Sequence, residues 1–251
     1  MKQVTTFSLA TLLLSTGAAS AQTTFRLGVR GGANRALTTV AAASNSTGTY
    51  PYSYAADKSA IYAWQGGLIA EWARGKFALQ PGLQFSQKGE KFNTSTTISG
   101  ITGDSHSQTV STNRCNWLEL PLNLVYTLHG DYGLQLFAGP YVALAVGGRQ
   151  RGTTYPFYGP AIDSKPFDFD KQAGYGPDTN NRRLDAGVNF GVGYRQGPVQ
   201  VQLGYSLGLR NLHQATQDDM FDPGFFRNRN FNADAAYNRV AQLTGSYFFS
   251  L

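Results

Sequence analysis

The segment 199–210, VQVQLGYSLGLR, decides the fold because it alternates strictly between two kinds of side chain. Its odd-numbered positions are all apolar, and its even-numbered positions hold only glutamine, glycine, serine and arginine. A period of two indicates a β-strand with one apolar face. The alternation lasts for twelve residues, which is longer than the ~5–6 residues of most soluble strands. Its length suits a tilted membrane crossing of about 9–11 residues.

Seven other segments repeat this alternation, so we predict an all-β fold of eight antiparallel strands. In most of them the second face carries glycine, glutamine, asparagine, serine or a charged residue, whereas in one it also carries Phe137 and Tyr141. In chain order, the predicted strands are residues 25–30, 62–72, 77–86, 118–126, 134–144, 183–195, 199–210 and 242–251.

The connections between these strands alternate in length. Tight hairpins are expected at residues 73–75, 129–132 and 196–198. The other four connections, residues 34–59, 90–113, 148–182 and 211–238, are long and rich in Asn, Ser, Thr, Gly and Asp. Long loops are uncommon inside compact domains. The pattern predicts an up-and-down transmembrane β-barrel with short periplasmic turns, four long external loops and both chain ends on the side of the short turns.

The composition agrees with this interpretation. Of the 251 residues, 41% are hydrophobic, 14% are charged and 29 are glycine. The mean hydropathy is -0.28, and beyond the N-terminus no segment approaches the ~18 consecutive apolar residues of a spanning helix. These values exclude a helical membrane protein. They leave a membrane barrel open, because its alternating strands average to neutral hydropathy.

The first 21 residues have the features of a secretory signal peptide. Lys2 gives a charged start, residues 7–14 form an apolar core, and Ala19-Ser20-Ala21 is a small-residue cleavage site; the alternative is a first helix of the core. We therefore expect export to the outer membrane of a Gram-negative type cell, with one barrel domain over residues 22–251. Cys115 is the single cysteine, so no internal disulfide forms.

A soluble eight-stranded barrel of the lipocalin type is the alternative fold, and it would place the apolar face inside. The polar face here is too small and too weakly charged for a solvated surface, and it fits a narrow lumen filled by side chains. Its charges are expected to pair there: Glu71, Glu119 and Asp185 with Arg26, Arg30, Arg183 and Arg195. Aromatic residues at the strand ends would form interfacial girdles: Tyr62, Trp72, Phe77, Phe85, Tyr126, Tyr194, Tyr247 and Phe249.

Two features of the predicted strands need an explanation. Pro81, Pro121 and Pro140 lie inside strands, where proline forfeits a ladder hydrogen bond, so we expect β-bulges at these points. Glycines 31–32 and 191–193 also lie in strands and have no following helix, so they are not phosphate loops. We expect them to relieve crowding inside a narrow barrel.

With these residues in place, the chain resembles the PorT-like family of outer-membrane β-barrel proteins. The resemblance spans nearly all of the chain after the signal peptide, but lies in the strands. It is carried by GVRGGAN (28–34), LQP (79–81), SQKG (86–89), WLELPL (117–122), AGPYV (138–142), DAGVNFG (185–191) and GYSLGL (204–209). The resemblance implies fold and location and a possible link to secretion machinery, although most such relatives have no assigned activity.

Three positions depart from the family pattern. The family often has an acid at Gly82 and a lysine at Val125, so both ends of a common interior ion pair are missing. The last residue is Leu251 instead of an aromatic residue. Tyr247, Phe249 and Leu251 still alternate in a way that resembles a barrel-assembly signal.

The three histidines are the obvious candidates for acid–base chemistry. His106 and His213 fall in long connections, whereas His129 falls in a tight turn at the opposite end. His106 and Ser107 are the residue types of a base and a nucleophile, but neighbours on an extended strand point to opposite faces. Cys115 has no evident activating partner and is expected to be inert. We therefore predict no catalytic residue and no enzyme.

Acidic and basic groups in the long connections give weaker signals. Asp168 with Asp170, and Asp218 with Asp219 and Asp222, are the residue types of a Ca²⁺ site, but neither group has the spacing of a known loop, so no metal or cofactor is predicted. The net charge of the chain after cleavage is modest and dispersed, without the stripe that nucleic-acid binding requires. Two groups are candidates for contacting lipopolysaccharide or a partner, or for packing the loops together: Arg227 and Arg229 among Phe225, Phe226 and Phe231, and Tyr155 with Phe157 and Tyr158.

The sequence thus predicts an envelope structural or interaction protein with a side-chain-filled lumen and specificity in its external loops. Expected partners are outer-membrane lipids including lipopolysaccharide, the barrel-assembly machinery during insertion, and an envelope protein. Two alternatives stay open: a narrow passive pore for small solutes, and a lipid-modifying barrel enzyme.

Overall fold

The structure is a computed structural model that describes residues 23–39, 42–46, 52–100, 103–158, 164–175, 179, 181–213 and 236–250. The expected signal peptide, Asp218, Asp219, Asp222, Leu251 and the arginine–phenylalanine group at 225–231 lie outside these residues. No helix in the described part of the chain is long and apolar enough to cross a membrane. The strands are β1 (Thr24–Thr39), β2 (Ala42–Ser46), β3 (Tyr52–Arg74), β4 (Phe77–Gly100), β5 (Gly103–Thr127), β6 (Tyr132–Tyr158), β7 (Phe167–Gln172), β8 (Leu184–Gln196), β9 (Val199–Gly208) and β10 (Tyr237–Ser250).

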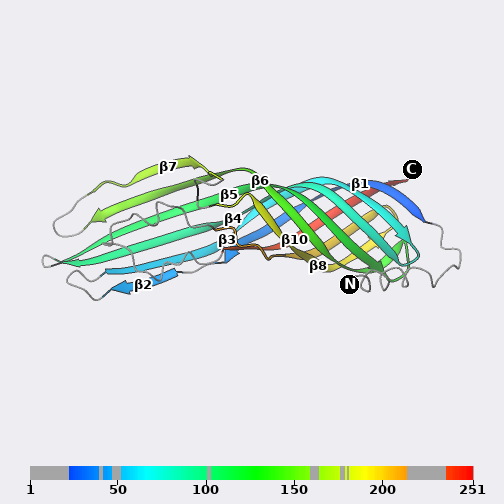
Figure 1. Cartoon of the computed structure of the whole chain (residues 1–251), viewed down its shortest axis with the longest axis horizontal. Helices are drawn as coiled ribbons and strands as arrows, with labels where there is room; N and C mark the ends of the chain where they lie inside the picture. The colour runs from blue at the N-terminus through cyan, green and yellow to red at the C-terminus, as the bar shows by residue number, and fades with distance from the viewer. Residues whose placement is uncertain are drawn as a thin grey trace, which may run out of the picture.

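Eight of these strands close into a ring in which every neighbouring pair is antiparallel. The order is β1, β3, β4, β5, β6, β8, β9 and β10, and β1 pairs both with β10 and with β3. Figure 1 shows the ring at the right. An all-β, antiparallel ring of eight strands is thereby confirmed.

Short connections join the strands at one end of the ring, which we call the turn end. β3 meets β4 at residues 75–76, β5 meets β6 at 128–131, and β8 meets β9 at 197–198. Gly75 and Gly197 have φ values of 62° and 57°, a left-handed conformation that glycine adopts without steric cost. All three tight hairpins were therefore predicted at the right places.

At the other end, four strands of the ring continue outward as a sheet that we call the extension (Figure 1, left). β3, β4, β5 and β6 stay paired there, β2 adds to the edge of β3, and β7 adds to the edge of β6. β4 and β5 pair in register as far as Gly100 and Gly103. The prediction of four long loops is therefore wrong for three connections, because the described residues within 34–59, 90–113 and 148–182 are largely strand. Their polar residues can extend the ladder because the backbone, not the side chain, supplies its hydrogen bonds.

The ring has its apolar face outside and its polar face inside. Leu68, Leu134 and Leu203 are 63%, 65% and 59% exposed. Along β5 and into the turn that follows it, the exposed apolar side chains run from Leu118 to Leu128. Glu71, Glu119 and Asp185 are instead fully buried. The face assignment made from the alternation is thus confirmed, and the lipocalin-type arrangement is not what the ring shows.

Aromatic residues gather on the outer face near the turn end. Their rings pair with centroids about 5 Å apart: Phe25 with Trp72, Phe77 with Tyr126, and Tyr247 with Phe249. At the opposite end of the apolar band, Tyr62 is 74% exposed and Trp64 stacks on Phe85.

The prolines interrupt the ladders without a bulge. Between β3 and β4 the pairs on either side of Pro81, Ile69–Gly82 and Trp72–Leu79, keep the same register. The same holds between β5 and β6 around Pro140, and between β4 and β5 around Pro121, where the Pro81–Leu122 and Gln84–Glu119 pairs flank the gap. Register shifts occur elsewhere, at Ala60/Gln65, His106/Gln108 and Asn116/Trp117. The expected bulges at the prolines are therefore wrong: two residue pairs drop out of one ladder at each proline, and the flanking pairs hold the register.

Inside the ring, large side chains of β6 lie against glycines of β8 and β9. A Cβ added at Gly191 would lie 2.8 Å from the Phe137 ring, and one added at Gly187 would lie 2.7 Å from the Tyr141 ring. Gly191 therefore relieves crowding, as its place in the sequence predicted. At one of the departures from the family pattern, Val125 is fully buried and packs with Ala78 and Phe137.

Candidate functional site

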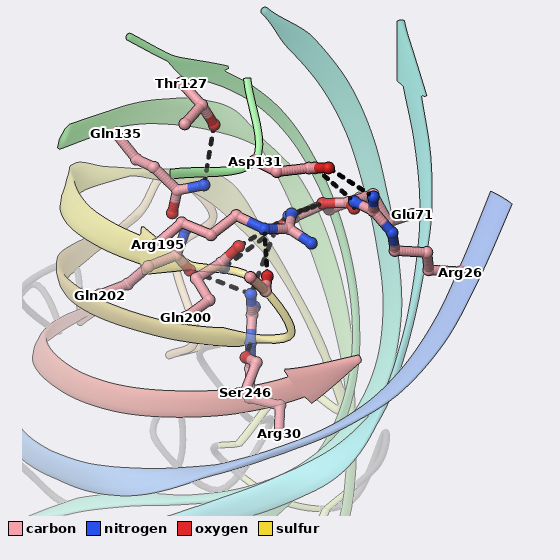
Figure 2. A network of polar contacts seen from close by, with 12 residues as sticks. Arg26, Arg30, Glu71, Thr127, Asp131, Gln135, Arg195, Gln200, Gln202 and Ser246 are labelled. Atoms are coloured by element: carbon pink, nitrogen blue, oxygen red, sulfur yellow. Dashed lines mark hydrogen bonds and ion pairs between the residues drawn. The ribbon is translucent and has the colours of Figure 1, made fainter. Parts of the chain in front are cut away.

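The most highly organised part of the interior is a network of polar side chains near the turn end (Figure 2). Glu71 on β3 is fully buried and accepts hydrogen bonds from Arg26 on β1 at 3.1 Å and from Arg195 on β8 at 2.6 Å. It also accepts one from Gln80 on β4 at 2.7 Å. One carboxylate thus joins three other strands, and it is the carboxylate that pairs with the buried Arg195 among the described residues.

Amides and hydroxyls extend this network across the ring. Gln80 and Gln200 donate to each other at 3.0 and 3.3 Å. Arg30 donates to Ser246 and to Gln202, each at 3.0 Å, and to Gln80 at 3.4 Å. No carboxylate pairs with Arg30 among the described residues. Its charge is solvated instead by side-chain oxygens of three strands.

A turn residue closes the network at its solvent side. Asp131 accepts two hydrogen bonds from Arg26 at 2.9 and 3.0 Å, while its own side chain is 61% exposed. The hydrogen bond and charge of Arg26 hold the pKa of the Asp131 carboxyl below its usual range. Arg26 therefore bridges a buried and an exposed carboxylate.

A second group of charges lies deeper in the ring, centred on Lys88 of β4. Its ammonium group is fully buried and pairs with Glu119 of β5, and it lies 3.9 Å from a carboxylate oxygen of Asp185 on β8. The same oxygen accepts hydrogen bonds from Tyr141 at 3.0 Å and from Asn238 at 2.8 Å. Lys88 also lies 4.7 Å from the centroid of the Tyr141 ring, which adds cation–π attraction.

The interior charges were found only in part by sequence reasoning. Glu71, Glu119, Asp185, Arg26, Arg30 and Arg195 face inward as predicted, but Arg183 is exposed before β8 begins. Lys88 and Asp131 were missed. The signal for Lys88 was its parity, since it continues the inward series Gln80, Gln84 and Ser86 beyond the predicted end of that strand.

The structure does not assemble the candidate catalytic residues into one site. His106 lies on β5 in the extension, where its Nδ1 is 3.0 Å from the Thr97 hydroxyl, and the neighbouring Ser107 hydroxyl donates to the Tyr155 carbonyl at 3.1 Å. His129 stacks on Tyr132 in a turn at the opposite end. His213 forms an isolated bridge with Asn181. His106 and Ser107 are thus in contact with two different strands, β4 and β6.

Cys115 is partly buried in the fold, and the predicted acidic pair, Asp168 and Asp170, is hydrogen-bonded to the neighbouring strand β6. Burial raises the pKa of the Cys115 thiol to about 11, which disfavours the reactive thiolate. Asp168 and Asp170 lie on β7, not in a solvated loop: Asp168 accepts from Thr153, and Asp170 accepts from Arg149 and Arg151. Among the described residues, no group of three or more His, Cys, Asp or Glu side chains is placed to hold a metal ion.

The interior leaves little open space. A cavity of about 10 Å³ lies between Arg30, Pro121 and Phe137, about the volume that one water position needs. Towards the extension, a pocket of about 150 Å³ is lined by Glu90, Cys115, Trp117 and Tyr175 among others.

A larger depression lies on the outer face, where the extension leaves the ring. This groove has a volume of about 970 Å³ and crosses β4, β5, β6 and β7. Its lining includes Arg114, Arg149, Arg151 and Asp170, and we call it the arginine groove. Sequence reasoning did not single out these arginines, because they come together only when the strands pair.

The closed ring and its polar interior define an outer-membrane type of β-barrel, and comparison with known proteins agrees. The sequence profile of the outer membrane protein beta-barrel domain matches residues 20–214. The chain belongs to this family. No curated protein matches the chain. Among solved structures, the crystal structure of Pseudomonas aeruginosa OpdL shares 10% identity over 92% of this chain and 99% of that chain, with a TM-score of 0.12. That similarity is too low to bear on fold or function.

Proposed function

We propose that this chain is an eight-stranded up-and-down transmembrane barrel of the outer membrane, and that it acts as a structural or interaction protein of the cell envelope. The observation that carries the proposal is the inversion of the two faces: leucines cover the outside, and paired charges fill the inside. Such a surface is stable when its surroundings are lipid rather than water.

The height of the apolar band supports this proposal. Leu118 on β5 and Leu128, the first residue after that strand, are ten residues apart. At ~3.4 Å per residue and a strand tilt of about 40°, they span roughly 26 Å across the membrane. The apolar band of known outer-membrane barrels is about 25 Å tall.

The extension is the surface that we propose for interaction. From Asn116 to Gly103, β5 reaches about 40 Å beyond the ring, at ~3.4 Å per residue. The sheet ends in the edge strands β2 and β7, and β7 carries Asp168, Asp170 and Lys171. Charged edges resist unspecific strand pairing, which favours recognition by side chains. The PorT-like resemblance suggests an envelope protein, including a secretion component, as the partner, and the barrel-assembly machinery is proposed to insert the chain.

The membrane proposal is tested by heat-modifiability. The full-length protein, taken from an outer-membrane fraction, is run on a denaturing gel with and without boiling. We expect two mobilities, because a membrane barrel resists the detergent until it is heated. A single mobility together with partitioning into the soluble periplasmic fraction would contradict the proposal and favour a lipocalin-like ligand carrier.

The interaction role is tested by shortening the β4–β5 hairpin of the extension. Lys91 and Thr112 face each other in register, so residues 92–111 can be replaced by an Asn-Gly turn. We expect the shortened chain to insert normally but to reproduce the phenotype of a full deletion. If it restores the wild-type phenotype, the ring alone suffices and this part of the extension is not the interaction surface.

A passive pore is the second candidate, and the dense interior weighs against it. The Glu71 network, the Lys88 cluster and the rings of Phe137 and Tyr141 occupy the path through the barrel. Single-channel conductance equal to that of bare membrane is expected. A lipid-modifying enzyme has less support, since His106 and Ser107 bond to different strands. His106→Ala or His213→Ala is expected to leave lipid composition unchanged.

A further inference from the structure

The arginine groove lies on the outward face of the extension, directly beyond the apolar band. On β5 the outward positions continue from Leu118 through Asn116 to Arg114, and on β6 from Val146 to Gly147 and Arg149. The strands pair so that Arg114 lies opposite Arg149, and Arg151 lies opposite Asp170. The pairing of β5, β6 and β7 therefore brings three arginines to one outer surface, with the Arg114 guanidinium directed across β4 to β3.

The groove carries a net positive charge, and some of its arginine N–H donors have no acceptor among the described residues. Asp170 is the acid among the described residues that line it, against three arginines. Asp170 accepts from the Nε atoms of Arg149 and Arg151, at 2.5 and 2.9 Å. Within the described chain, the terminal nitrogens of these two arginines have no hydrogen-bond partner. Arg114 is held beside the band by one hydrogen bond to the Tyr62 carbonyl.

The height of the groove matches the headgroup layer of a membrane. Arg114 lies four residues beyond Leu118, or roughly 10 Å above the end of the band at the rise and tilt used above. The headgroup layer of a bilayer is about 5–8 Å thick on each side, and arginine side chains reach back towards it. Asn116, at the lower edge of the groove, adds a side-chain carbonyl oxygen that is buried and unpartnered among the described residues.

From this geometry we infer that the arginine groove binds the phosphorylated sugar headgroup of lipopolysaccharide in the outer leaflet. Guanidinium groups bind phosphate through paired, charge-assisted hydrogen bonds. The lipid's acyl chains would then lie against Leu118, Leu144 and Val146. The inference rests on the proposed membrane location, and it identifies one lipid and its site.

The test measures binding of diphosphorylated lipid A to the folded full chain in a zwitterionic detergent by native mass spectrometry. Arg114→Ala with Arg149→Ala is expected to weaken binding at least tenfold. Arg114→Ala alone leaves the contacts of β7 intact and is expected to weaken it severalfold. Asp170→Asn removes a competing carboxylate and is expected to tighten it. The matched control, Arg74→Ala with Lys76→Ala, removes two exposed cations at the turn end and is expected to change nothing.

Three results would overturn the inference. In the first, lipid A without its phosphates binds as tightly as diphosphorylated lipid A. In the second, inorganic phosphate displaces lipid A completely. In the third, the turn-end control variant loses as much binding as the groove variant. Each variant is first checked for heat-modifiability. If the wild-type chain fails that check, the proposed function fails. If the wild-type chain passes that check but the arginine substitutions leave lipid A binding unchanged, only the assignment of the groove fails.

Discussion

Glu71 is the residue on which the turn-end network depends, because it accepts hydrogen bonds from side chains of three other strands. Its carboxylate is shared between Arg26 and Arg195, and Arg195 is only 2% exposed. Breaking a buried ion pair from one side leaves a charge that neither water nor protein compensates.

Replacing Glu71 by glutamine should therefore destabilise the barrel by about 3 kcal/mol or more. The substitution preserves the shape of the side chain, removes its charge and replaces one accepting oxygen by an N–H donor. Unfolding of the refolded protein in urea, followed by tryptophan fluorescence, measures the loss. Asp131→Asn is the matched control, because its carboxylate is largely exposed and should contribute less than about 1 kcal/mol. Equal effects of the two substitutions would show that burial does not govern this network.

At the residue scale, sequence parity identified most of the interior but not its pairing. Glu71, Glu119 and Asp185 were placed inside because they alternate with leucine and tryptophan. Their partners depend on strand register and on the curvature of the ring, neither of which a single segment encodes. Lys88 illustrates this, since it follows three inward polar residues but precedes a polar stretch that looked like the start of a loop.

Among the elements, β6, β8 and β9 pack together inside the ring because large side chains on β6 lie against glycines on β8 and β9. Phe137 and Tyr141 point inward from β6, and glycines on the neighbouring strands leave room for them. A narrow ring cannot accept large residues from every strand at one level, because its interior is filled to normal packing density.

Gly191→Ala tests this match. Its Cβ would lie 2.2 Å from the Leu203 carbonyl oxygen and 2.8 Å from the Phe137 ring, so overpacking should cost about 1–3 kcal/mol. Gly245→Ala on β10 is the control, since no heavy atom lies within 4 Å of its added Cβ, and its effect should stay within about 0.5 kcal/mol. The midpoint of urea unfolding distinguishes them, and two equal midpoints would contradict the packing argument.

The elements of the ring were predictable and those of the extension were not. Alternation of leucine with glutamine identifies a strand that has one apolar face. The segment 90–113 has polar residues on both faces, rich in Ser, Thr and Asn, which is also the composition of a loop. Only its pairing partner makes it a strand.

On the scale of the whole molecule, the exposed leucines decide between lipid and water as the surroundings. Leu203→Arg, in the middle of the apolar band on β9, should cost about 2–4 kcal/mol in lipid, and Val110→Arg on the extension should cost about 0–1 kcal/mol. Both side chains are exposed, at 59% and 44%. The amount of heat-modifiable protein in the membrane fraction and the urea midpoint in lipid report the difference. A water-soluble barrel would tolerate both substitutions alike.

The seam between β1 and β10 also sets the order of events when the chain folds. It joins the two ends of the described chain, from Arg26 opposite Ser250 to Thr39 opposite Tyr237. Until β10 is in place, both β1 and β9 therefore keep one edge of unpaired backbone groups, which lipid cannot satisfy. Closure is consequently an all-or-none step that waits for β10. A chain shortened by its final strand should be held by chaperones and degraded before it reaches the membrane.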